Sequence, residues 1–511
     1  MTSPLVAHPA AELSVRPIEA ADESVLLRWR QSSDSMQFGL RPTQIDPEDH
    51  HRWFARSLTG DLRRVFIAHL GDEPIGMLRY DLYPPGPEIS IYFLPQFRGR
   101  GHGRSAFLAT VSEVLLEARS QVITARARLD NERSAAFFRG LGFRCVATTD
   151  HYLLEFQRPE VPHSRPSISD AEVEGAAAVV RSGHLAQGPR VAELERQWAE
   201  ATGNSGSVAV SSGVAALRLA LLALDVGPDE EVIVPTYSCV ALLNAVLALG
   251  GVPRLADVLQ DDWTLDPADV ERLQGPRTRA IIAVHLFGYP AKMKRLLSFG
   301  VPVVEDCAHG IGGHTHEGSA YGGAGSISIA SFYATKMLCG GEGGMIAAND
   351  AKLLDRVRQA REYGDQPPDG RHLNDKMTDV EAAIILAQLS RLPDMLNQRR
   401  ERAARYTDQL QSLAKQGLLV LPSDVPGRIW YRYAVRLTQS FAHELVKSLR
   451  DYGISCEQPV WDLRAAVSDA DAPVSGLGFD RVLSLPLYPG LTGLEQQWVV
   501  TALQRCLQHK Q

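Results

Sequence analysis

A single lysine, Lys336, stands just after an apolar, strand-like run over residues 326–333 and just before the glycine-rich segment 339–344. Upstream, residues 301–306 are typical of a buried strand that ends in an acid, Asp306. An amine and a carboxylate at two strand ends suit pyridoxal phosphate. The amine forms a Schiff base with the aldehyde, and the carboxylate keeps the pyridine nitrogen protonated so that the ring accepts electrons. The spacing alone agrees equally well with an ordinary α/β core.

A glycine-rich turn is the second candidate site. Residues 96–103 lie between an apolar strand over 88–94 and a helix that runs through Glu117. Such a turn points backbone N–H groups and a helix N-terminus at one spot, which suits a pyrophosphate. Tight turns between strand and helix also use glycine for structural reasons alone, so both interpretations stay open here.

Composition limits the classes of protein. The 511 residues predict two to four domains, and 45% hydrophobic and 22% charged residues describe a globular chain with a large core. The net charge of -7 gives no reason to expect nucleic-acid binding. Six scattered cysteines without a C-x-x-C pair argue against a disulfide scaffold and a zinc site, so no metal is expected. Without a transmembrane window or a leader pattern, a cytoplasmic enzyme is the default.

The elements that must position these residues fall into two parts, separated by a polar, proline-rich linker at residues 157–167. Behind the linker, strands and helices alternate, which predicts a mostly parallel sheet with helices on both faces. Ligands of such sheets bind beyond the carboxyl ends of the strands, where Asp306 and Lys336 fall. Before the linker, we expect strands at 13–17, 65–69, 75–81, 88–94 and 123–128, and helices at 21–31 and 131–143.

Residues 13–156 resemble the GNAT family of acetyl-CoA-dependent N-acyltransferases. Arg98, Gly101 and Gly103 match the family's phosphate loop, and Asn131 matches the asparagine before its last helix. The resemblance implies a GNAT α+β fold and acetyl-CoA as cosubstrate. The runs around Trp29-Arg30 and residues 48–54 are similar to the branch that acetylates amino groups on nucleotide-linked sugars. Implied cofactor contacts are Arg98, Gly99, Gly101, Gly103 and Asn131.

One departure concerns catalysis in this first part. The family usually has a tyrosine seven residues after the asparagine, where it can protonate the leaving thiolate, but this sequence has Phe138. Another group or water must then supply the proton, or the domain is slow or only binds its ligand. As the base that accepts the amine proton we predict Glu88, directly or through water; a solvated strand-end carboxylate is the alternative.

Residues 168–508 resemble the DegT/DnrJ/EryC1/StrS family of sugar aminotransferases, a fold-type-I branch of the pyridoxal-phosphate enzymes with a small C-terminal α+β domain. The matching runs, in chain order, are 212–217, 231–235, 284–288, 305–309, 331–336, 374–379 and 484–489. So many ordered matches imply the family's roles for the matching residues. Lys336 would carry the cofactor and move the proton, and Asp306 would pair with the pyridinium nitrogen.

The remaining cofactor contacts follow from the same resemblance. His309 would lie beside the phenolic oxygen, while Ser331 and the backbone of Gly213 and Val214 would hold the phosphate, helped by Asn374 from a second subunit. His309 as a core histidine and Ser331 as a strand hydroxyl are the structural alternatives. The family commonly has threonine at the position of Val214, so one hydroxyl contact is missing.

These matches predict four segments and two activities. We expect a GNAT-like domain at 1–156, the linker at 157–167, a large cofactor-binding domain at 168–395 and a small domain at 396–511. The hypothesis is amination of a nucleotide-linked keto-deoxysugar, with L-glutamate as donor, followed by N-acetylation of the new amine, in a homodimer. One alternative acceptor is an aminocyclitol or another small carbonyl compound. In another alternative the GNAT-like half binds CoA or a sugar without turnover. A cofactor-dependent gene regulator would need a basic helix-turn-helix, which the sequence lacks.

Overall fold

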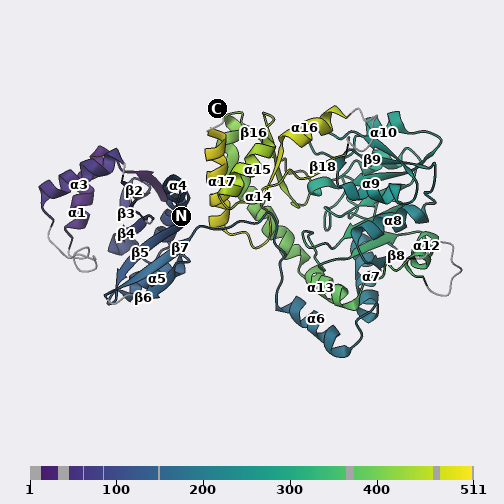
Figure 1. The fold of residues 1–511 in the computed structure, drawn as a ribbon, viewed down its shortest axis with the longest axis horizontal. Helices are drawn as coiled ribbons and strands as arrows, with labels where there is room; N and C mark the ends of the chain where they lie inside the picture. Colours follow the sequence, from purple (N-terminus) through teal and green to yellow (C-terminus); the bar gives the residue numbers. More distant parts are fainter. Residues whose placement is uncertain are drawn as a thin grey trace, which may run out of the picture. The chain divides into compact units, whose positions relative to one another are not determined.

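The computed structural model describes residues 13–32, 45–60, 62–84, 86–147, 150–363, 373–463 and 472–508 (Figure 1). The chain divides into two compact units, Met1–Glu160 with Gly493–Arg505, and Val161–Thr492 with Cys506–Gln511. Within the described ranges, the helices are too short or too polar to cross a lipid bilayer. The predicted boundaries of the GNAT-like, large and small domains remain predictions.

The first unit is built on a seven-stranded sheet in the order β1-β2-β3-β4-β5-β7-β6. Every neighbouring pair is antiparallel except β4 and β5, which run parallel. The strands confirm the predicted positions to within two residues. They are β1 (Leu13–Pro17), β2 (Arg63–Leu70), β3 (Glu73–Asp81), β4 (Glu88–Phe93), β5 (Val122–Arg128), β6 (Arg144–Ala147) and β7 (His151–Gln157).

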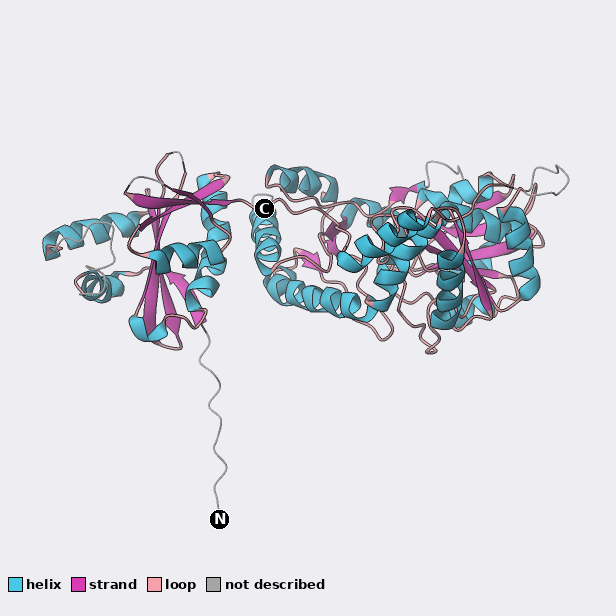
Figure 2. Ribbon diagram, turned by 90° about the horizontal axis from the view of Figure 1, so that it is seen from below, coloured by secondary structure: helices cyan, strands magenta, loops and turns pink. Residues whose placement is uncertain are grey.

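Helices cover both faces of this sheet (Figure 2). On one face, α1 (Glu23–Arg30) and α3 (Pro47–Thr59) pack Leu26, Trp29 and Phe54 against side chains of β2 and β3. Residues of the other face contact α4 (His102–Ala118), where the Tyr80 hydroxyl lies 2.7 Å from the Thr110 hydroxyl. The short helix α5 (Glu132–Gly140) begins at Asn131, whose side-chain oxygen accepts from the Ser134 N–H at 3.1 Å.

The parallel contact between β4 and β5 is short. The register joins only Glu88 with Thr124 and Ile89 with Ala125. The rest of β4 therefore has no strand partner on that side, and its backbone faces the cavity described below. A break of this kind in the middle of a sheet opens a route for a ligand to reach backbone polar groups.

The second unit is built on another seven-stranded sheet, in the order β11-β9-β12-β13-β14-β15-β8. The first five strands are parallel, and β15 is antiparallel to both of its neighbours. This confirms the predicted mostly parallel sheet. The strands are β8 (Gly206–Val210), β9 (Glu231–Pro235), β11 (Val252–Ala256), β12 (Thr278–Val284), β13 (Val303–Asp306), β14 (Ile327–Ser331) and β15 (Gly344–Ala348).

Both faces of this sheet are buried, as a parallel sheet requires. Val232 and Val234 of β9 join one apolar cluster, whereas Ile233 between them joins another. Because side chains alternate along a strand, the two clusters lie on opposite faces. The first contains α8 (Gly213–Ala223), α9 (Val240–Leu247) and α12 (Ala351–Arg361). The other contains α10 (Pro267–Leu273) and α11 (Met293–Leu297).

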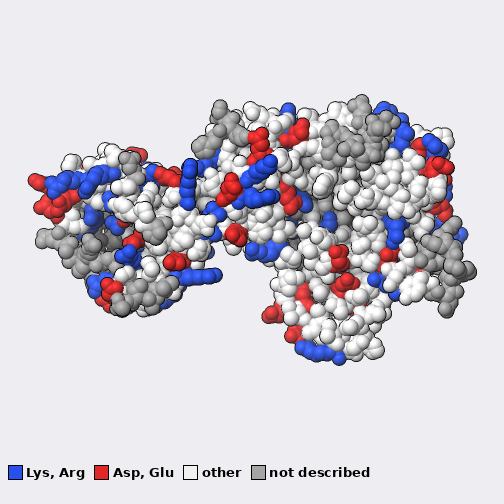
Figure 3. Space-filling view, viewed as in Figure 1, with Lys and Arg blue, Asp and Glu red and all other residues white. Residues whose placement is uncertain are grey.

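A long helix leads into the last elements of the second unit. These are α14 (Leu392–Lys415), α15 (Ala442–Asp451), α16 (Pro473–Arg481) and an antiparallel sheet of β16 (Leu419–Val420), β17 (Tyr433–Leu437) and β19 (Val482–Leu485). The second half of the predicted linker packs here. Val161 is buried and forms an isolated parallel β-bridge with Ile454. A ring nitrogen of His163 lies 2.8 Å from the Ser484 hydroxyl. On the face shown in Figure 3, acidic and basic side chains are interspersed.

Candidate active sites

Asp306 and Lys336 come from neighbouring strands of the second unit. Asp306 ends β13 and pairs in register with Ile329 of β14, and Lys336 follows the end of β14 at Ser331. The Asp306 carboxylate is 3% exposed and accepts from the Ala308 N–H at 2.8 Å. Burial raises the pKa of Asp306, while the Ala308 N–H and the Lys336 charge act in the opposite direction. The predicted acid and amine are therefore close enough to interact electrostatically.

His309 and Tyr431 form a stacked pair beside Lys336. The two ring centroids are 4.2 Å apart, and the Lys336 Nζ lies 5.5 Å from the Tyr431 ring centroid. Burial lowers the pKa of His309, and the charges of Lys336 and Arg432 lower it further, so the imidazole is neutral. The buried Nδ1 atom of His309 has no hydrogen-bond partner among the described residues. An orphaned nitrogen is costly unless a ligand atom satisfies it.

The predicted phosphate seat lies at the N-terminus of α8. Ser212 caps this helix by accepting from the Ala215 N–H at 3.1 Å. A Cβ built on Gly213 would come within 2.7 Å of the Ser331 Cβ, so only glycine allows Ser331 to approach the helix end. Unpaired N–H groups and the helix dipole favour an anion at this position. Val214 is 47% exposed there and offers no hydroxyl.

These residues fit pyridoxal phosphate. A buried carboxylate, an amine, a helix N-terminus next to a serine and an unpartnered ring nitrogen supply the donor set that its ring, aldehyde and phosphate need. Asn374 is exposed, and the segment that follows it runs beside β8, because Lys376 bridges Val210. The contact of Asn374 from a second subunit with the cofactor phosphate remains a prediction.

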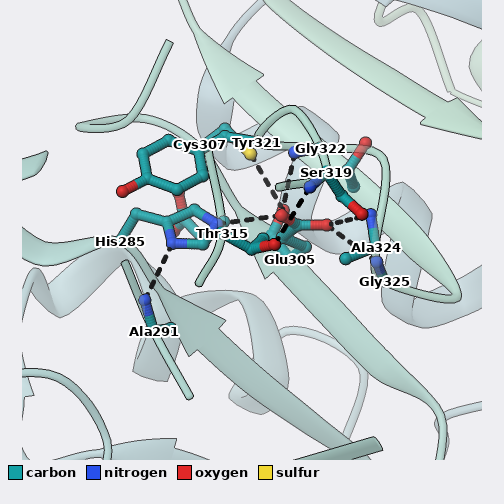
Figure 4. Close-up of polar contacts among 12 residues, drawn as sticks. His285, Ala291, Glu305, Cys307, Thr315, Ser319, Tyr321, Gly322, Ala324 and Gly325 are labelled. Carbon is teal, nitrogen blue, oxygen red and sulfur yellow. Dashed lines mark hydrogen bonds and ion pairs between the residues drawn. The ribbon is translucent and has the colours of Figure 1, made fainter. Parts of the chain in front are cut away.

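A hydrogen-bond network occupies the side of β13 opposite to Asp306 (Figure 4). The Glu305 carboxylate is fully buried and accepts from three backbone N–H groups at 2.7–3.0 Å, and a nitrogen of His285 lies 2.9 Å from it. The other ring nitrogen of His285 accepts from the Ala291 N–H, so the neutral ring donates its Nε2 proton to Glu305. The N–H donors belong to Gly322, Ala324 and Gly325.

Cys307 completes a group of three ligand-type side chains with His285 and Glu305, whose ligand atoms lie within 4.8 Å of one another. Both ring nitrogens of His285 and both Glu305 oxygens already have hydrogen-bond partners. Burial also raises the pKa of Cys307, which keeps the thiol protonated. The group therefore acts as an anchor that fixes the end of β13.

The first unit contains a cavity of about 1640 Å³. The predicted base and all of the implied acetyl-CoA contacts line it: Glu88, Arg98, Gly99, Gly101, Gly103 and Asn131. Gly99 and Gly101 have φ angles of 75° and 85°, which favour glycine, and open space surrounds both. Gly103 instead packs against Phe137, whose ring a Cβ would meet at 3.1 Å.

Glu88 and Phe138 also line this cavity. The Glu88 carboxylate forms an ion pair with Arg126 at 3.1 Å. Phe138 is 4% exposed and packs against Phe143 with ring centroids 5.1 Å apart. The position that carries tyrosine in the family thus combines a packed ring with access to the cavity.

Several residues of the two sites were not singled out in the sequence. Tyr431 lies beside Lys336, and the Cζ atom of Arg432 lies 5.5 Å from the Tyr431 ring centroid. The run 430–433, with three aromatic residues, is the one local signal for them. Tyr237 is 1% exposed within an aromatic cluster and belongs to the core. Arg63 and Arg79 line the first cavity and belong to no motif, whereas Arg30, which also lines it, belongs to the Trp29-Arg30 run noted in the sequence.

Two parts of the chain match known protein families. Residues 166–504 match the DegT/DnrJ/EryC1/StrS aminotransferase family, and residues 12–144 match the acetyltransferase (GNAT) domain. The aminotransferase TlmJ from Streptoalloteichus hindustanus is 29% identical and covers 69% of this chain and 100% of its own, with a TM-score of 0.65. DesV of S. venezuelae, solved with a ketimine intermediate, is 31% identical and covers 66% and 94%, with a TM-score of 0.60.

A third similar structure is NtdA from Bacillus subtilis, solved with the bound cofactor PMP. It is 26% identical and covers 69% of this chain and 87% of its own, with a TM-score of 0.61. The aminotransferase family uses pyridoxal phosphate, and GNAT domains use acetyl-CoA. The aminotransferase match spans more than half of the residues. The chain is therefore an enzyme that belongs to the DegT/DnrJ/EryC1/StrS aminotransferase family and carries a GNAT acetyltransferase domain at its N-terminal end.

Proposed function

We propose that this chain aminates a keto group on a nucleotide-linked deoxysugar, with L-glutamate as donor, and then acetylates the new amine with acetyl-CoA. The observation that carries the proposal is the placement of Lys336, shortly after β14, within electrostatic reach of buried Asp306 at the end of the neighbouring strand β13, in a chain that also holds the cavity of the first unit. Products of this kind serve the biosynthesis of polysaccharides that contain amino sugars.

The aminotransferase residues would divide the work as follows. When bound, pyridoxal phosphate supplies an aldehyde for the amino group and a ring that takes up electrons. The Lys336 Nζ attaches it and moves the proton at the substrate carbon, and Asp306 holds a proton on the ring nitrogen. His309 donates to or accepts from the phenolic oxygen. Ser331 and the backbone at Gly213 and Val214 bind the phosphate, with Asn374 of a second subunit completing a homodimeric site.

In the acetyltransferase cavity, the turn from Arg98 to Gly103 would bind the pyrophosphate of acetyl-CoA, with Asn131 contacting the same ligand. Glu88 would accept the amine proton through its carboxylate or a water. Water or a substrate group would protonate the departing thiolate, since Phe138 has no proton to donate.

A substrate panel with the full-length protein tests this function. A coloured protein that glutamate bleaches, and that nucleotide-linked keto sugars restore, would support the amination step. Release of thiol from acetyl-CoA, dependent on the aminated product, would support the acetylation step. Restoration by a keto cyclitol alone would instead support the alternative acceptor.

Phe138 favours a second candidate function for the first unit. If that unit binds CoA or a sugar without turnover, thiol release stays at the background rate although CoA binds in calorimetry. The amination step would be unaffected by this outcome. Cytoplasmic location follows for either function, because glutamate, nucleotide sugars and acetyl-CoA are cytoplasmic compounds.

A further inference from the structure

Three arginines gather in the acetyltransferase cavity at the end away from the glycine turn. Arg30 ends α1, Arg63 opens β2 and Arg79 lies near the end of β3. Arg63 pairs in register with Asp81, and residues 79 and 81 share one face of β3, so the three side chains of the sheet lie on one side. All of them line the cavity together with Trp53.

The charges of this cluster do not balance. Arg63 and Arg79 share the Asp81 carboxylate, with N–O distances of 2.5 Å and 3.0 Å. Arg30 has no carboxylate within 4.0 Å in the part of the chain that the structure describes. Three positive charges against one negative charge leave an excess of two.

The only side chain that hydrogen-bonds to Arg30 within the described ranges is neutral. Arg30 donates to the Nδ1 of buried His50 at 3.2 Å, so the ring proton is on Nε2, which lies 3.3 Å from the Glu23 backbone oxygen. Burial and the charge of Arg30 lower the pKa of His50. Burial, Arg79 and Arg63 lower the pKa of Arg30 to about 10, so its guanidinium remains charged at neutral pH.

An indole ring holds two of these guanidinium groups in place. The Cζ atom of Arg30 lies 4.4 Å from the Trp53 ring centroid, and that of Arg63 lies 5.6 Å away. Stacking of this kind restricts both side chains before any ligand arrives. Placing like charges close together lowers the stability of the fold. Residues that bind a ligand often carry such a cost in stability.

We propose that Arg30, Arg63 and Arg79 bind a phosphate or diphosphate group of the acyl acceptor. The inference rests on the proposed function, in which the acceptor is a nucleotide-linked amino sugar, and it assigns the seat of the nucleotide's diphosphate. Two or more negative charges on that group match the excess of two, and guanidinium groups bind phosphate oxygens in bidentate fashion.

The same chemistry could come from acetyl-CoA, which also carries phosphates, but the geometry separates the two ligands. Asp81 pairs in register with Glu88 at the start of β4, whereas the glycine turn follows the end of β4 at Phe93. A strand of this length spans about 17 Å. The cavity thus offers one anion seat at each end of β4.

Equilibrium binding to the full-length protein tests this assignment without any turnover. Calorimetric titration with inorganic pyrophosphate, and separately with uridine diphosphate, is carried out on protein saturated with CoA, which fills the glycine turn. We expect each probe to bind at a site that depends on these arginines. Uridine diphosphate is also expected to bind at the acceptor site of the second unit, and the arginine variants should leave that binding unchanged. Arg30→Gln and Arg79→Gln should each weaken binding about ten- to a hundredfold, as expected for loss of a charged hydrogen bond. Arg30→Lys should keep most of the affinity.

Arg52→Gln is the matched control, because Arg52 lies on α3 beside Trp53 but is exposed and paired with Asp49. This variant should bind both probes as the parent does. Absence of pyrophosphate binding to the CoA-saturated protein would overturn the proposal. So would parental affinity in Arg30→Gln and Arg79→Gln.

Thermal unfolding separates binding from a structural role. Removing a crowded charge should leave the Arg30→Gln midpoint at or above that of the parent, and a lower midpoint with unchanged affinity would contradict the proposal. If pyrophosphate binding weakens as expected but no nucleotide-linked amino sugar is acetylated, the anion site stands and the proposed acceptor fails. If such sugars are acetylated with the same KM by parent and variants, the anion site fails and the proposed function stands.

Discussion

The two candidate sites are built in opposite ways. In the second unit, Asp306, His309 and Ser331 are buried, and the Ala308 N–H holds the Asp306 carboxylate in place. Lys336 and the predicted phosphate seat at the start of α8 are partly exposed. In the first unit, the residues line a cavity of about 1640 Å³, and charged side chains surround much of it. A site that holds one fixed cofactor is packed around that cofactor. A site for a large acceptor is open, and its charged side chains recognise the acceptor.

This difference determines how mutations should act. At the packed site, the removal of one group should abolish chemistry or destabilise the fold, because its neighbours cannot rearrange. At the open site, single changes should shift rate or affinity by modest factors. The experiments below test this contrast from the largest expected effect to the smallest.

Lys336→Ala should have the largest effect. Without the amine, the cofactor cannot be attached and the proton at the substrate carbon has no carrier, so amino transfer should fall about a thousand- to ten-thousandfold. Borohydride reduction followed by peptide mass spectrometry should find the cofactor on Lys336 in the parent protein only. Lys352→Ala, on the exposed side of α12, serves as the control. Amino exchange at the parental rate in Lys336→Ala would remove the basis of the aminotransferase assignment.

Asp306→Asn should lower the rate of the half-reaction with glutamate about a hundred- to a thousandfold, because the neutral amide no longer favours a proton on the cofactor ring. The two side chains have the same shape, so the thermal midpoint should change little. Stopped-flow absorbance measures the rate, with the exposed Asp394→Asn as control. A small change in rate would mean that Asp306 does not contact the ring nitrogen.

Glu305→Gln should damage the fold while Asp306 remains unchanged beside it. The amide offers one acceptor where the carboxylate offered two oxygens to three N–H groups and His285, so the free energy of unfolding should fall by about 3 kcal/mol. Denaturant titration measures this loss, and the exposed Glu317→Gln should show none. Equal losses in both variants would contradict the role of Glu305 as an anchor.

The same variant tests a pH dependence. Although burial alone would raise it, the hydrogen bond from His285 and the backbone N–H groups lower the pKa of Glu305 below its ordinary value of 4.5. The stabilisation is therefore fully present above pH 4.5 and is lost as the pH falls through the lower, folded-state pKa. Glu305→Gln should lack this acid-side loss in denaturant titrations repeated at falling pH.

Sequence reasoning reached the packed site more completely than the open one. The ordered runs predicted Asp306 at a strand end and Lys336 just after one, and the structure has them at the end of β13 and shortly after β14, because strand, acid and turn follow one another along the chain. Tyr431 was not predicted, because it lies in the segment before β17, 95 positions beyond Lys336, and only packing brings the two together. The fold class was predictable for the same reason: alternation of strands and helices is local.

The open site shows the limit of that reasoning. The glycine turn could be predicted from the sequence. The positive φ angles at Gly99 and Gly101 favour glycine at both positions, so the turn leaves a recognisable spacing of glycines in the sequence. The arginine cluster could not be predicted in this way. Its three members lie on three elements, and only the β2–β3 register and the placement of α1 bring them together. An acceptor pocket is encoded by tertiary placement rather than by a motif.

Phe138→Tyr tests whether the open site lacks only one proton donor. The ring lines the cavity, so a hydroxyl there can reach the leaving thiolate, and thiol release should rise about tenfold if protonation limits the rate. Phe137→Tyr, the neighbouring ring of the same cavity, is the matched control. A rate that stays at the parental value would mean that water already supplies the proton.

Val214→Thr should have the smallest effect. It tests whether the cofactor site of the second unit can still gain a contact. Valine and threonine have nearly the same shape, so the exchange adds one hydroxyl at the N-terminus of α8 without disturbing the helix. One further hydrogen bond to the cofactor phosphate should tighten cofactor binding about three- to tenfold. Titration of the cofactor-free protein measures this, and Val240→Thr, at the start of α9, is the control. Tightening in Val214→Thr alone would show that even the packed site keeps one unfilled contact, whereas equal affinities would mean that the backbone N–H groups already satisfy the phosphate.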